Sequence, residues 1–137
     1  MKPVNCTVKD DPANGSYGDC VRACVASVLE MESDEVPHFY HDGDGEAGFE
    51  RMRFWLAPER IPAYFTMPGD KPLNWAIGYV GGAYDDAPFM LFCSSGGADH
   101  CIAVDEKGEI HNPAWYKAPI DGPHSSGVWI VIILARI

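Results

Sequence analysis

The two halves of the chain follow different hydrophobic periodicities, and this contrast constrains the fold more than any other feature. From position 20 to 31, apolar and small residues recur every three or four positions without glycine or proline, which is typical of one helix face. Four short apolar segments occur later, at 89–93, 100–105, 109–112 and 127–134. Helices followed by strands predict an α+β fold with a mainly antiparallel sheet.

Other segments complete this outline. Positions 7–19 are rich in polar and turn-forming residues and predict a loop, with Asp19 as the N-cap of the first helix. Positions 47–57 predict a second helix, and 61–67 predict a strand that Pro68 closes. Positions 75–80 fit either a strand or a short helix, and 117–126 carry no pattern that assigns a structure. A chain of 137 residues fits one compact domain, 1–137.

Charge and composition exclude several classes of function. Ten basic against twenty acidic residues give a net charge of −10, which disfavours binding to nucleic acids and to anionic membrane surfaces. The longest apolar run, at 128–135, is too short to cross a bilayer. The first residues lack the apolar run of a signal peptide, and the cysteines number five. Together these features predict a cytoplasmic protein with free thiols.

Cys20 is the leading candidate for a catalytic nucleophile. It opens the first helix directly after Gly18-Asp19. The unpaired N–H groups and partial positive charge of a helix N-terminus stabilise a thiolate, so the sequence predicts a lowered pKa for Cys20. Cys24 lies one turn later on the same helix face and is expected to be buried and inert.

His100 is the candidate base, because it begins a strand after the glycine-containing loop at 94–98. A three-residue turn at 106–108, with Gly108 in the left-handed conformation, pairs Asp105 with Glu109. His100 and Asn112 then project from the same face of the sheet, within reach of each other. A two-residue turn would place them on opposite faces, so the prediction depends on the turn geometry.

Two groups are candidates for stabilising an oxyanion. One is the backbone N–H of Cys20 at the helix start, and the other is the side-chain amide of Asn14, six residues earlier.

These residues resemble those of papain-like cysteine peptidases. The similarity covers about residues 14–114. It rests on Gly18-Asp19-Cys20 opening a helix, on His100 opening an apolar strand, and on His111-Asn112-Pro113. The similarity is greatest to small domains of the double-glycine leader peptidase type, in particular to small phage and bacterial proteins. Asn14 stands where such enzymes usually carry Gln, and Asn112 where the small relatives often carry Asp.

The resemblance implies a papain-like fold in which the cysteine helix packs on an antiparallel sheet. It also implies hydrolysis or transfer of an amide, peptide or thioester bond, with a peptide, protein or small molecule as substrate and no metal or cofactor. Cys20 would attack the carbonyl, His100 would transfer the proton, Asn112 would orient His100, and Asn14 would stabilise the oxyanion. A phage protein of this kind would act in the host cytoplasm.

Two other classes of function stay open. The departures at positions 14 and 112 are compatible with a papain-like domain that has lost turnover and binds a peptide or small molecule. A phage-encoded inhibitor or sequestering protein acting on a host system is one example. A structural component of a virion is the third reading.

Each candidate residue also has a purely structural interpretation. Cys20 is compatible with a core thiol and His100 with a hydrogen-bonded core histidine. Asn112 before Pro113 and Asn14 before Gly15 are both typical of turns.

Overall fold

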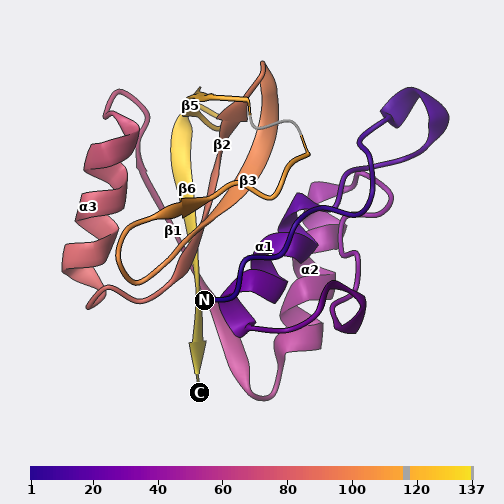
Figure 1. Ribbon diagram of the computed structural model, residues 1–137, viewed down its shortest axis with the longest axis horizontal. Helices are drawn as coiled ribbons and strands as arrows, with labels where there is room; N and C mark the ends of the chain where they lie inside the picture. Colours follow the sequence, from indigo (N-terminus) through magenta and orange to yellow (C-terminus); the bar gives the residue numbers. More distant parts are fainter. Residues whose placement is uncertain (116–117, 137) are drawn as a thin grey trace.

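A six-stranded sheet lies between two helical layers (Figure 1). The computed structural model describes residues 1–115 and 118–136, and the elements below belong to those residues. The helices are α1 (Cys20–Leu29), α2 (Gly45–Leu56) and α3 (Leu73–Ala83), with short 3₁₀ turns at η1 (Pro12–Asn14) and η2 (Ser33–Glu35). The strands are β1 (Arg60–Pro68), β2 (Phe89–Ser95), β3 (Ala98–Val104), β4 (Ile110–His111), β5 (Ile120–Pro123) and β6 (Val128–Arg136).

The strand order is β1-β6-β2-β3-β4, and β5 pairs with the end of β2. All neighbouring strands are antiparallel. The predicted α+β class with a mainly antiparallel sheet is therefore confirmed. Among the described residues, no helix is both long and apolar enough to cross a membrane.

Alternation along the central strands divides the core into two clusters. On β3, Cys101 and Ala103 pack in the cluster that contains α1 and α2, whereas Ile102 and Val104 pack in the cluster that contains α3. Successive side chains of a strand point to opposite faces, so a sheet covered on both faces reads as a continuous apolar run. This explains the continuous apolar runs at 89–93 in β2, 101–104 in β3 and 128–135 in β6.

Several local predictions need correction. The segment at 75–80, which fits either a strand or a short helix by sequence, belongs to the helix α3. This helix has eleven residues, and three of them are glycines. The predicted loop at 94–98 is shorter, because Ser94 and Ser95 belong to β2 and Ala98 to β3. Only Gly96 and Gly97 form the turn, both with positive φ, as a tight two-residue hairpin requires. The strand β5 had no sequence signal, and part of the unassigned region, 116–117, lies outside the described residues.

Candidate active site

The β3–β4 hairpin brings His100 and Asn112 together. Its turn has three residues and Gly108 is left-handed with φ of 78°. The Asp105 N–H donates to the Glu109 carbonyl at 3.0 Å. The pairing of Ala103 with His111 continues the same register. His100 Nε2 and Asn112 Oδ1 are 2.7 Å apart, so the predicted contact between these two side chains is confirmed.

The surroundings of Asn112 determine which imidazole nitrogen carries the proton. The Ala114 backbone N–H donates to Asn112 Oδ1 at 3.1 Å, and Asn112 Nδ2 lies 3.5 Å from the Ala118 carbonyl. A backbone N–H can only donate, so this side-chain atom must be the amide oxygen. His100 Nε2 therefore donates its proton to Asn112. In the neutral ring, Nδ1 then carries the lone pair, which is the form a general base needs.

Cys20 is the first residue of α1 and lies beside the start of β3. Its side chain is partly buried against the α1 cluster. The backbone N–H of Cys101 contributes a hydrogen bond to the Cys20 sulfur. Because Cys101 directly follows His100, the fold brings the candidate nucleophile beside the strand that carries the candidate base.

Asp19 holds the start of α1 in place, although not as predicted. It occupies the N-cap position, yet its side chain makes no capping hydrogen bond. Its buried carboxylate instead accepts hydrogen bonds from the backbone N–H groups of Thr7 and Val8, and it pairs with Arg22 at 2.8 Å. Burial alone raises the pKa of Asp19, but the hydrogen bonds from Val8, Arg22 and Thr7 outweigh it and lower the pKa below its ordinary value. The helix start thus has no side-chain cap over its first N–H groups.

The predicted lowering of the Cys20 pKa is wrong for this structure. Burial raises the pKa of the Cys20 thiol well above its ordinary value, and the neighbouring Cys101, Cys6 and Asp19 raise it further. The hydrogen bond from the Cys101 N–H works in the opposite direction but is outweighed. The helix N-terminus favours a thiolate only where solvent or a cation also stabilises the charge, and desolvation opposes it here. Cys24 is fully buried, as predicted.

Asn14 is engaged in a local turn. Its side chain is exposed, and its Nδ2 donates to the Asp11 carboxylate at 2.8 Å. Gly15 follows in the left-handed conformation, as the Asn-Gly sequence predicts for a turn. The Asn14 amide therefore serves the η1 turn. His100 and Asn112 are joined on the β3–β4 hairpin, and Cys20 lies at the start of α1.

The N-terminal segment joins the two sides of this region, which the sequence did not indicate. The Cys6 N–H donates to the Pro113 carbonyl at 2.8 Å, next to Asn112. Two residues on, the Val8 N–H donates to Asp19, next to Cys20. The five cysteines are in the reduced thiol form. Cys6 itself contributes electrostatically to the raised pKa of the Cys20 thiol.

Tyr40 is a second residue near Cys20 that sequence reasoning missed. Burial, with a further contribution from Cys101 and Cys20, raises the pKa of its hydroxyl, which stays protonated as a donor at neutral pH. Its ring packs against Gly48 of α2, where a Cβ would come within 2.4 Å of the ring. A glycine inside an otherwise regular helical segment was the one available signal, because such a glycine often marks a close approach.

Neither of two well-formed surface hollows in the described part of the chain is lined by Cys20, His100 or Asn112. The larger hollow lies over α2, between Phe39 and Phe54, and the other lies beside α3. Comparisons with protein-family models, with curated proteins and with solved structures find no match to this chain.

Proposed function

We propose that this protein is a small papain-like thiol hydrolase that uses Cys20, His100 and Asn112. The observation that carries the proposal is the Nε2–Oδ1 hydrogen bond between His100 and Asn112, because it leaves the proton-accepting lone pair on His100 Nδ1. The position of Cys20 at an uncapped helix start beside β3 supports the same role. The papain-like assignment of the α+β fold is part of this proposal.

The reaction would proceed by general-base activation and not from a preformed ion pair, since the Cys20 thiol is neutral. His100 Nδ1 takes the thiol proton while Sγ bonds to the carbonyl carbon of an amide or thioester. The backbone N–H of Cys20 donates to the oxyanion. The leaving nitrogen or sulfur takes the proton from His100, and water then hydrolyses the acylated Cys20. The substrate must first displace the groups that bury the thiol.

Acyl transfer to Cys20 tests this proposal directly. The protein is incubated with p-nitrophenyl acetate at pH 8, and acetylated peptides are identified by mass spectrometry. We expect acetylation of Cys20 that falls about 100-fold in His100→Ala, which is the lower range for loss of a general base. His41→Ala, which removes an exposed histidine, is the matched control and should react like the wild type. Equal rates in wild type and His100→Ala would contradict the proposal.

A second candidate function is binding without turnover, with a peptide or small molecule as ligand, as in an inhibitor or sequestering protein. Two observations favour it. The Cys20 thiol has a raised pKa, and the Asn14 amide is occupied by Asp11. This alternative predicts no acetylation above that of a free thiol and full biological activity after Cys20→Ala.

A further inference from the structure

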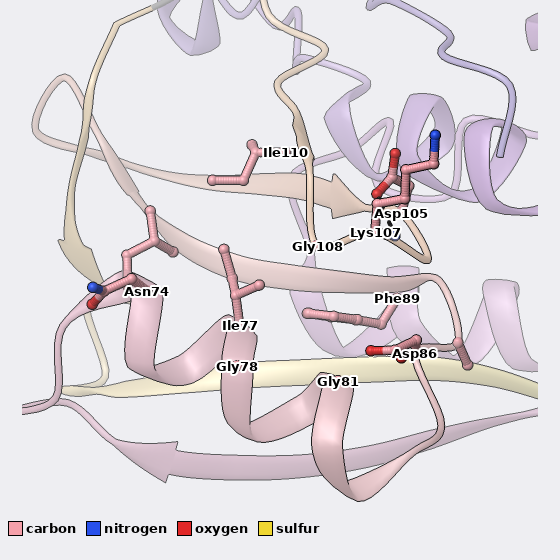
Figure 2. A pocket seen from close by; sticks show the side chains of 12 residues that line it. Asn74, Ile77, Gly78, Gly81, Asp86, Phe89, Asp105, Lys107, Gly108 and Ile110 are labelled. Atoms are coloured by element: carbon pink, nitrogen blue, oxygen red, sulfur yellow. Dashed lines mark hydrogen bonds between the residues drawn. The ribbon is translucent and has the colours of Figure 1, made fainter.

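A groove of about 490 Å³ lies between α3 and the turn that joins β3 to β4 (Figure 2). Leu73 and Ile77 of α3, Phe89 of β2 and Ile110 of β4 form its apolar wall. Ile110 retains 43% exposure although it is a large apolar residue. The volume falls within the range of small-molecule sites, which are mostly apolar with a few polar groups. The groove shares no residue with the proposed catalytic group.

Two glycines shape the α3 side of the groove. A Cβ at Gly78 would meet no heavy atom within 4 Å, so the space beside this residue is empty of protein. At Gly81 a Cβ would come within 2.9 Å of Asp86 Oδ1. The lack of a side chain at Gly81 therefore lets the Asp86 carboxylate lie against the helix, where Figure 2 shows it directed between Gly81 and Phe89.

The polar side chains that line the groove are two carboxylates, one amide and one ammonium group, from Asp86, Asp105, Asn74 and Lys107. Asp86 lies at one end, and Asp105 lies in the hairpin turn, where its Oδ1 accepts the backbone N–H groups of Lys107 and Glu109 at 2.8 and 2.9 Å. Figure 2 shows the Lys107 ammonium directed away from α3. Within the described ranges, neither carboxylate takes part in an ion pair.

We infer that this groove binds a small amphipathic cation. An aromatic or branched aliphatic group packs against Ile77 and Ile110, and an ammonium group lies beside the Asp86 carboxylate. The net charge of −10 attracts cations toward the whole surface and repels anions. The groove has an apolar wall with a carboxylate at its end. This arrangement favours a ligand that carries both an apolar group and a positive charge.

Binding is tested by titrating the ¹⁵N-labelled protein with 2-phenylethylammonium and following the amide resonances of Gly78, Gly81 and Gly108. We expect saturable shifts of these three amides. The neutral 2-phenylethanol should bind roughly tenfold more weakly, which corresponds to losing one charge-assisted hydrogen bond. Asp86→Asn should weaken ammonium binding by a similar factor. Asparagine suits this position because Asp86 has φ of 55°, which asparagine tolerates.

A matched pair of helix variants tests the location. Gly78→Leu fills the groove and should abolish binding, while leucine also favours the helix. Gly82 lies on the same helix and has equally open surroundings, but it does not line the groove. The Gly82→Leu protein should therefore bind the ammonium like the wild type. Equal affinity for the ammonium and the alcohol would overturn the inference. Unchanged binding in Gly78→Leu, or the absence of saturable shifts in the wild type, would overturn it too.

Discussion

His100 Nε2 donates to Asn112 Oδ1 across 2.7 Å, and the backbone N–H of Ala114 donates to the same oxygen. Because Asn112 Oδ1 accepts both hydrogen bonds, the backbone that follows β4 helps to determine which tautomer of His100 is present. Pro113, which lies between Asn112 and Ala114, accepts a hydrogen bond from the Cys6 N–H. The candidate base is therefore oriented by groups that are far apart in the sequence.

Replacing Asn112 with alanine should allow the neutral His100 ring to adopt both tautomers. The ¹⁵N shifts of the imidazole should change from predominantly protonated Nε2 toward a mixture of both neutral forms, because Asn112 Oδ1, which accepts the Nε2–H, is lost. Loss of the Ala114 contact should also lower the free energy of unfolding by about 1 kcal/mol. Asn112→Asp retains an acceptor oxygen and should preserve the Nε2–H form. A wild-type imidazole spectrum in Asn112→Ala would count against the positioning role.

The neutral Cys20 thiol predicts slow alkylation at neutral pH. Burial raises the pKa of this thiol, so iodoacetamide should modify Cys20 more slowly than glutathione at pH 7, and the rate should still be rising without a plateau at pH 9.0, the ordinary thiol pKa. Mass spectrometry of the modified peptide assigns the site, and Cys20→Ser is the control for reaction at Cys6. Rapid modification at pH 6 that depends on His100 would instead demonstrate a preformed thiolate–imidazolium pair.

The Asp19 carboxylate should make stability depend on acid pH. Its pKa in the folded protein is lowered, so its stabilising contribution is complete above the ordinary pKa of 3.8 and is lost as the pH falls through the folded value. Asp19→Asn should lower the free energy of unfolding by about 2 kcal/mol at pH 7, because charged hydrogen bonds to Arg22 and Thr7 are weakened. Urea unfolding at pH 7 and at pH 3 measures both effects.

Wild type and Asp19→Asn should differ less at pH 3 than at pH 7. Below the ordinary pKa of 3.8 the carboxylate of the unfolded chain takes up a proton, and the lowered pKa in the folded protein then favours unfolding of the wild type. Glu50→Gln is a suitable control, because Glu50 forms an exposed pair with Arg53 at 2.6 Å and contributes little. A difference between wild type and Asp19→Asn that stayed constant from pH 7 to pH 3 would argue against a charge-dependent contribution.

The hairpin that precedes His100 depends on left-handed glycines. Gly97 has φ of 78°, so Gly97→Ala should lower the free energy of unfolding by about 1 kcal/mol. The same substitution at Gly82, inside α3 and with no heavy atom near its Cβ position, should instead raise it by roughly 0.5 kcal/mol. Thermal unfolding should show a lower melting temperature than the wild type for Gly97→Ala and a higher one for Gly82→Ala. Stabilisation by Gly97→Ala would show that the two-residue turn does not form as described.

The sequence by itself determined the features that depend on neighbouring residues. A helix starting at Cys20, the left-handed Gly108 and the resulting common face of His100 and Asn112 all follow from local spacing and backbone conformation. These features are predictable because turn length and φ preference act within a few residues. The strand β5 was not predictable, because its pairing with β2 is set by contacts at Ser94 and Cys93 and not by its own composition.

Only the tertiary structure decided the electrostatic state of the candidate site. Whether Cys20 is a thiol or a thiolate depends on burial beside Cys101, which is distant in the sequence. Whether Asp19 caps α1 or binds elsewhere depends on Thr7 and Val8 reaching it. Helix-end effects extend over about one turn, whereas desolvation is set by every segment that covers the group. Local sequence therefore determines where these residues lie on the backbone, and long-range packing determines their protonation states.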